Sequence, residues 1–176
     1  MKLQTLEGAG TRPTTDRVKE NLFNILAPYV ENSKVLDLFA GSGGLGIEAL
    51  SRGAEGAVFS DQNEKCIQII KKNLEHTKMA DKAGVFLGEA ALILKKLSQH
   101  RQKFDIIFLD PPYKKGIIPQ ILRYLEEYGI LNEKFIIIAE TDISDELPES
   151  IGCMIISKLQ AYGSTKLTFY KRINKG

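Results

Sequence analysis

The sequence has few of the features that mark disulfide-rich, metal-binding or membrane-spanning proteins. Of its 176 residues only two are cysteines, Cys66 and Cys153, which lie far apart and without a nearby histidine cluster. We expect two small buried hydrophobes there and no zinc site or disulfide framework. The longest strongly apolar run, residues 135–139, is far too short to span a bilayer. Because no apolar signal stretch follows Met1, we expect a cytoplasmic protein that needs neither a membrane nor a metal.

An excess of one charge sign is also lacking. The formal net charge is only +2, and a strong nucleic-acid footprint is usually more basic. Any RNA binding must therefore depend on local basic clusters, each of which alone is weak evidence because such pairs commonly lie on solvated helix faces. The candidate clusters are Arg12/Arg17/Lys19, Lys71/Lys72, Lys95/Lys96, Lys114/Lys115 and Lys171/Arg172/Lys175.

What the sequence does contain is an alternation of short apolar segments with helical patterns. The apolar fraction of 43% and the length suit one globular domain. Strands that are apolar throughout and separated by helices indicate a parallel sheet covered on both faces, which right-handed crossovers make doubly wound. The expected strands are 34–40, 57–60, 85–87, 104–109 and 135–139, and the expected helices between and after them are 44–52, 64–74, 90–97 and 117–128.

The two ends of the chain differ from this alternation. Residues 153–158 and 166–170 have no helix between them, which predicts an antiparallel hairpin at the sheet edge and seven strands in all. Near the start, Thr15–Leu26 has a possible cap after Pro13 and a helical apolar stripe. We expect one α/β domain over residues 1–176, with an N-terminal segment and helix (1–30) followed by the core (34–176).

A first candidate site follows the first expected strand. Gly41, Gly43 and Gly46 have the spacing G-x-G-x-x-G, which lets the backbone turn sharply and approach a nucleoside cofactor beyond the strand ends. Asp61, at the end of the second expected strand, is placed to accept hydrogen bonds from ribose hydroxyls. The glycine spacing alone is a weak signal, but its pairing with Asp61 favours a bound cofactor over a bare tight turn.

Asp37 distinguishes between the possible cofactors. A carboxylate within an apolar strand is costly to bury without a partner. Beside a dinucleotide's pyrophosphate it would add a second negative charge, whereas S-adenosylmethionine carries a sulfonium and an ammonium that suit it, directly or through water. Asp37 therefore favours S-adenosylmethionine, the alternative being a strand carboxylate satisfied by backbone amides.

A second candidate site is Asp110-Pro111-Pro112-Tyr113, which ends the fourth expected strand and faces the same cleft. Two consecutive prolines fix the backbone and remove two N–H donors, which leaves a stiff platform of acceptors beside an aromatic ring. Acceptors that grip both N–H bonds of an exocyclic amino group free its lone pair for a methyl donor, while Tyr113 can stack on the base. The alternative is a Pro-Pro turn without catalytic role.

These motifs together resemble a known family. The blocks are Thr11–Glu20, Asp37–Gly46 with Glu48–Gly53 after it, and Asp110–Tyr113. They look like the RsmD-type 16S ribosomal RNA guanine-N2 methyltransferases of bacteria, over nearly the whole chain, and Thr11–Glu20 is the most specific part. The resemblance implies a Rossmann-like fold and methyl transfer from S-adenosylmethionine to N2 of a guanine in 16S RNA, either free or in an assembling small ribosomal subunit.

The resemblance also implies roles for individual residues. The catalytic residues would be Asp110, Pro111, Pro112 and Tyr113; the cofactor residues Asp37, Phe39, Gly41, Gly43, Asp61, Glu89 and Ala90, the last two at the adenine; and the substrate residues Arg12, Arg17, Lys114 and Lys115. Family members often have Asp or Asn where Glu89 stands and Glu where Asp61 stands. They usually begin with a basic, β-rich segment ahead of Leu3. Its absence from this sequence fits either a truncated start or a divergent subgroup, and basic residues that would strengthen RNA binding are absent with it.

Other functions fit parts of the pattern. Methyltransferases of adenine N6 or of a protein glutamine amide share the second site but more often carry Asn at position 110. An NAD-dependent oxidoreductase would explain the three glycines and Asp61, but no group for hydride chemistry is evident. A non-catalytic RNA-binding module would not need the Asp110–Tyr113 motif.

Overall fold

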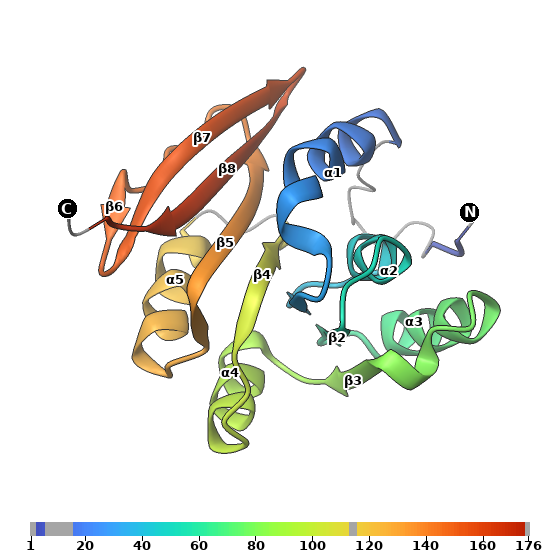
Figure 1. Cartoon of the computed structure of the whole chain (residues 1–176). Coiled ribbons are helices and arrows are strands. Elements are labelled where there is room, and N and C mark those ends of the chain that lie inside the picture. The colour runs from blue at the N-terminus through green and yellow to red at the C-terminus, as the bar shows by residue number, and fades with distance from the viewer. Residues whose placement is uncertain (1–2, 6–15, 113–115, 175–176) are drawn as a thin grey trace.

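The computed structural model describes residues 3–5, 16–112 and 116–174, in which helices and strands alternate as far as β5 and strands follow alone (Figure 1). The helices are α1 (Asp16–Val30), α2 (Gly44–Ser51), α3 (Glu64–His76), α4 (Ala90–Gln99) and α5 (Ile117–Glu127), with a short 3-10 turn η1 (Ala80–Lys82). The strands are β1 (Lys34–Asp37), β2 (Gly56–Asp61), β3 (Ala83–Leu87), β4 (Phe104–Leu109), β5 (Leu131–Asp142), β6 (Ser150–Ile151), β7 (Met154–Tyr162) and β8 (Thr165–Arg172).

All these strands join one sheet in the order β3-β2-β1-β4-β5-β8-β7-β6. Strands β1 to β5 run parallel, while β8 pairs antiparallel with β5 and with β7. The predicted α/β fold, with a parallel core and a C-terminal antiparallel hairpin, is thus confirmed. The strand order reverses between β1 and β4, which is where ligands bind in open sheets of this kind.

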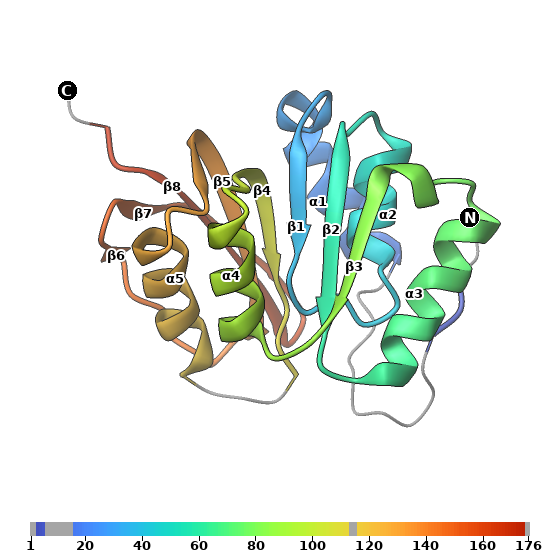
Figure 2. The ribbon, with the colours of Figure 1, turned by 90° about the horizontal axis from the view of Figure 1, so that it is seen from below.

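Helices cover the two faces of the parallel strands (Figure 2). The apolar sides of α1, α2 and α3 bury one face, and those of α4 and α5 bury the other. The periodic residues of α3 illustrate this, since Ile67, Ile70 and Leu74 all point into the core. None of the helices within the described ranges is long and apolar enough to cross a membrane.

Element boundaries differ from the predicted ones where tertiary contacts decide them. Helix α1 continues past Pro28 to Val30, because the buried Val30 extends the apolar stripe by one more turn. Strand β1 stops at Asp37, three residues early, so this carboxylate lies at the end of the strand rather than inside it. Strand β5 runs on to Asp142 because β8 pairs with it that far.

The hairpin also carries a strand that the sequence did not predict. Two residues, Ser150 and Ile151, form β6 and pair with the beginning of β7, which makes eight strands instead of seven. Farther along β7, a register shift between Ile156 and Lys158 marks a β-bulge against β8. A two-residue strand has too short a pattern to be recognised in a sequence.

Candidate functional site

Four acidic residues meet at the carboxyl edge of the parallel sheet. Asp37 and Asp61 end β1 and β2, Asp110 directly follows β4, and Glu89 lies two residues after β3. Because these strands are parallel, their ends lie on one edge, as the sequence predicted. Of the other predicted site residues, Tyr113, Lys114, Lys115 and Arg12 lie outside the described residues.

The turn after β1 depends on three glycines in two different ways. Gly41 and Gly43 have φ of +57° and +82°, in the left-handed region that side chains disfavour. Gly43 N–H donates to the Ala40 carbonyl at 2.7 Å and leads into α2. Gly46 is needed for packing instead, because a Cβ there would lie 2.3 Å from Cε1 of Phe59. Among the described residues, a Cβ on Gly41 would meet nothing within 4 Å, so they leave open space on that side of the turn.

Asp61 fixes this turn from the neighbouring strand. Its carboxylate accepts the Gly41 N–H at 3.0 Å and the Asn63 N–H at 2.9 Å, one on each oxygen. The buried Cys66 thiol is also hydrogen-bonded to the Asp61 carboxylate. The pKa of this thiol is raised to about 11, mostly by burial and next by the charge of Asp61. Asp61 is half-buried, so part of this residue remains accessible to solvent. The sequence placed Asp61 correctly but gave Cys66 no role beyond packing.

Asp37 lies beneath the same turn and is only 2% exposed. Its Oδ2 accepts the Gly46 N–H at 3.1 Å, so its observed contact is with the start of α2. Burial raises the pKa of this carboxyl from 3.8 to about 7; the Gly46 hydrogen bond opposes this rise and the charge of Asp61 adds to it. Asp37 therefore carries a proton more readily near neutral pH than an ordinary aspartate does.

This pKa predicts a pH-dependent stability. In the unfolded chain Asp37 ionises near pH 4, while in the folded chain it keeps its proton to about pH 7. Its contribution to the free energy of unfolding is therefore full below pH 4 and is lost as the pH rises to 7, by a few kcal/mol at about 1.4 kcal/mol per unit. In urea denaturation from pH 5 to 8, the Asp37→Asn variant should gain stability relative to the wild type. Parallel pH curves for the two proteins would contradict this assignment.

The remaining cofactor candidates follow β1 and β3 at the same edge of the sheet. Phe39 is half-buried and packs against the core on the α4 side of the sheet. Glu89 is exposed and Ala90 begins α4. The Gly88 N–H donates to the Asp61 carbonyl at 3.0 Å, which ties the end of β3 to the end of β2. The segment proposed for adenine is thus joined to the strand end proposed for ribose.

The second predicted site is only partly described. Asp110 and Pro111 are half-buried and Pro112 is exposed, at the end of β4 and next to the strand end that carries Asp37. Arg17 is exposed in the first turn of α1. Asp110, Pro111 and Pro112 therefore lie on the edge of the sheet that also carries the glycine turn.

One residue near the site was missed by the sequence analysis. Asn73 on α3 is buried, and its side-chain amide donates to the Ser42 carbonyl in the glycine turn at 2.9 Å. The available signal was its position, since Asn73 occupies the same helical stripe as Ile70 and Leu74, where an apolar residue is expected.

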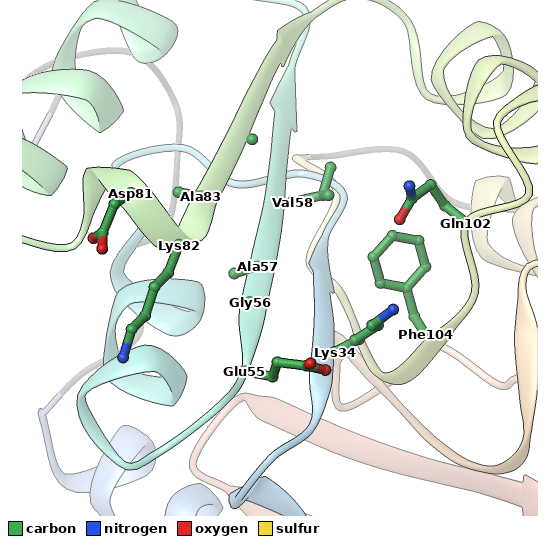
Figure 3. Close-up of a pocket in the computed structure, with 11 residues that line it drawn as sticks. Lys34, Glu55, Gly56, Ala57, Val58, Asp81, Lys82, Ala83, Gln102 and Phe104 are labelled. Atoms are coloured by element: carbon green, nitrogen blue, oxygen red, sulfur yellow. The ribbon is translucent and has the colours of Figure 1, made fainter.

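A hollow at the other edge of the sheet is distinct from this site (Figure 3). It has a volume of about 360 Å³ and is lined at the amino ends of the strands by residues that include Lys34, Gly56, Ala83 and Phe104. The parallel direction of the strands puts it opposite Asp37 and Asp61. Among the described residues, no group of three or more His, Cys, Asp or Glu could hold a metal ion.

Known proteins resemble the chain along most of its length. A family model described as "Conserved hypothetical protein 95" matches residues 1–171. Ribosomal RNA small subunit methyltransferase D of Escherichia coli strain K12 is 34% identical over 175 residues, which are 99% of this chain and 86% of that protein. A solved structure titled a conserved hypothetical protein of Streptococcus pyogenes has 38% identity and a TM-score of 0.83, covering 89% of this chain and 96% of its own.

A more distant solved structure shares the fold. An RNA methyltransferase from Salinibacter ruber, in complex with S-adenosyl-L-homocysteine, has a TM-score of 0.72 and covers 94% of this chain and 98% of its own. At 13% identity this likeness concerns the fold alone.

Proposed function

This chain belongs to the family of ribosomal RNA small subunit methyltransferase D, the conserved hypothetical protein 95 family, and we propose that it transfers a methyl group from S-adenosylmethionine to N2 of a guanine in 16S ribosomal RNA. The family resemblance seen in the sequence is thereby confirmed. The observation that carries the proposal is that Asp110-Pro111-Pro112 follows β4 on the sheet edge where the glycine turn and Asp61 lie. We further propose that residues 1–176 act as one catalytic domain, and the proposed substrate implies activity in the cytoplasm.

The residues of the first site fit S-adenosylmethionine. The space that the described residues leave open beside Gly41 lets a ligand approach the backbone closely, and the half-buried Asp61 carboxylate can accept hydrogen bonds from ribose hydroxyls. We propose that Phe39, Gly43, Glu89 and Ala90 complete this site. When bound, the cofactor supplies a methyl group on a positively charged sulfur. That positive charge favours the ionised form of Asp37. In the protein alone, burial raises the pKa of this carboxyl to about 7.

The second site is proposed to prepare the guanine. Asp110 would accept a hydrogen bond from the exocyclic N–H, and the rigid carbonyls of Pro111 and Pro112 would hold the second N–H in place. The bond from this nitrogen to the methyl carbon would form as the bond from that carbon to the sulfonium sulfur breaks, which leaves neutral S-adenosylhomocysteine. The Asp110 carboxylate would stabilise the positive charge on the nitrogen until one N–H proton is lost to solvent. Tyr113, which lies outside the described residues, is proposed to stack on the base.

The RNA backbone would be held by basic residues around this edge. We propose that Arg17, exposed at the start of α1, contacts a phosphate, and we propose the same for Arg12, Lys114 and Lys115 from the sequence. The partner would be 16S RNA, free or within an assembling small ribosomal subunit. The exposure of Arg17 leaves its guanidinium able to reach a ligand.

A transfer assay tests this function. In parallel reactions the full chain is incubated with tritiated S-adenosylmethionine and with deproteinised 16S RNA, small-subunit particles, DNA or a protein extract, all from cells that lack the modification. Label should enter the RNA in at least one form, and nuclease digestion with mass spectrometry should locate it on N2 of guanine. Label on adenine N6 of DNA or on a protein glutamine, with none in RNA, would replace the proposed substrate. No transfer to any of these would overturn the proposal.

A further inference from the structure

The segment that leads from β1 to the glycine turn is held from β2 by one serine. Ser60 is completely buried, with 0% exposure, and its hydroxyl donates to the Leu38 carbonyl at 2.7 Å. The Ser60 carbonyl accepts the Ala40 N–H at 2.9 Å. These two hydrogen bonds lie on either side of Phe39 along the chain, which is one of the proposed cofactor residues.

The Ser60 hydroxyl acts where the regular pairing of the two strands has ended. The last parallel pair of β1 and β2 is Asp37 with Phe59, so the hydrogen bonds of the buried Leu38 are made outside that ladder. On the other side, the Leu38 N–H donates to the Phe108 carbonyl of β4 at 3.4 Å, which is a long bond. Because a buried carbonyl without a partner is costly, Ser60 supplies the donor that lets the chain leave the ladder here.

A serine at this place in β2 is explained by the carbonyl that it binds. An apolar side chain would satisfy the burial of the strand equally well, and a buried hydroxyl is costly unless it finds a partner. The next residue, Asp61, accepts the Gly41 N–H at 3.0 Å. Two consecutive residues of β2 therefore hold the backbone from residue 38 to the first glycine of the turn.

We infer that Ser60 is a positioning residue for the cofactor, which holds residues 38–40 so that Phe39 and the glycine turn have their binding conformation before S-adenosylmethionine arrives. The inference rests on the proposed function, since it takes Phe39 and the turn as the cofactor site. Ser60 has no exposed surface, so it acts through the backbone and not by contact with the ligand. Without its hydroxyl the ligand has to order this segment as it binds, which lowers the affinity.

The test makes the same substitution at two matched serines. Ser33 is 3% exposed and its hydroxyl donates to the Val30 carbonyl at 2.6 Å, but it directly precedes β1, at the opposite edge of the sheet. Ser60→Ala and Ser33→Ala each remove one buried hydroxyl and one hydrogen bond to a backbone carbonyl. Calorimetry measures the dissociation constant of S-adenosylhomocysteine, which binds without reacting. Ser60→Ala should weaken binding about fivefold or more, the scale of one neutral hydrogen bond, and Ser33→Ala less than about twofold.

Further measurements distinguish positioning from general support of the fold. In the protein without ligand, amide hydrogen exchange at Ala40 should be faster in Ser60→Ala than in the wild type or in Ser33→Ala, because the Ser60 carbonyl holds that N–H. With saturating cofactor and RNA, the single-turnover rate of Ser60→Ala should match the wild type, since the bound ligand restores the segment. Ser60→Cys keeps a weaker donor in a similar shape, so its affinity should lie between those of the wild type and Ser60→Ala. It replaces Ser60→Ala in the comparison if that variant does not fold.

The outcomes separate this inference from the proposed function. If the variants at Ser60 and Ser33 bind S-adenosylhomocysteine as tightly as the wild type, or are weakened equally, Ser60 only supports the fold and the inference is wrong while the proposed function stands. If the variant at Ser60 lowers the single-turnover rate and leaves the dissociation constant unchanged, the inference is wrong as well. If the wild type binds no S-adenosylhomocysteine at all, the proposed function and the inference fall together.

Discussion

Replacing Asp110 by alanine should lower the single-turnover rate of methyl transfer by about 10²–10³-fold, the effect of removing one group that stabilises charge in a transition state. The amino nitrogen is neutral in the ground state and gains positive charge as it attacks the methyl carbon. A carboxylate aimed at that nitrogen therefore stabilises the transition state more than the bound substrate. The rate is measured with saturating cofactor and RNA, so that a change in affinity does not contribute.

The comparison that isolates this effect is Asp110→Asn. An asparagine keeps an oxygen that accepts a hydrogen bond but carries no charge, so its rate should lie between those of the wild type and the alanine variant. The dissociation constant of S-adenosylhomocysteine should change little in either variant. An alanine variant with a rate close to the wild type would make Asp110 a structural strand end, and the catalytic role of the whole Asp110–Tyr113 loop would be withdrawn.

The Asp61→Ala variant should bind S-adenosylmethionine more weakly by about 1.5–3 kcal/mol, the scale of hydrogen bonds to a charged group, which is roughly 10- to 150-fold in the dissociation constant. The variant loses the proposed ribose acceptor and also the two bonds that fix Gly41 and Asn63. Both losses act on the cofactor site. Calorimetry with the purified variant gives the dissociation constant directly.

Asp105→Ala provides a matched control at the other edge of the sheet. The Asp105 carboxylate also accepts a backbone N–H, from Lys34 at 2.8 Å, and a side-chain amide, from Asn132 at 2.9 Å. Removing this carboxylate also breaks two hydrogen bonds, but Asp105 lies at the amino ends of the strands. Cofactor affinity should be unchanged there, and equal weakening in both variants would mean that Asp61 acts only through general stability.

The sequence predicted the fold, and the edge of the sheet on which the acidic site residues lie, because both follow from local patterns. Apolar runs separated by helical stripes specify parallel strands, and parallel strands place Asp37, Asp61 and Asp110 on one edge of the sheet. The extents of α1 and β5 could not be predicted, since each depends on a partner distant in sequence. Strand β5 reaches Asp142 only because β8 lies beside it.

Within the candidate site, the sequence could not predict the hydrogen-bonding partner of each polar group. A pattern can mark Asp61 as a strand-end acid, but its bonds to Gly41 and to the Cys66 thiol depend on how the turn folds back. The same is true of Asn73, whose partners lie 31 and 69 residues away along the chain. Its polar character on an apolar stripe signals a buried role, but not which segments it joins.

The short strand β6 and the bulge in β7 have a consequence for how this protein behaves at high concentration. Strand β6 pairs with Met154 and Ile155 of β7, and the Ile156 N–H donates to the Glu149 carbonyl at 2.9 Å. Beyond Ile156, no strand of the described part of the chain pairs with this outer edge of β7. Open edges invite strand-to-strand aggregation. The bulge after Ile156 twists the edge away from a flat template, and the exposed Lys158 puts a charge where a second chain would have to pair. The hairpin thus ends the sheet in a form that discourages its further growth.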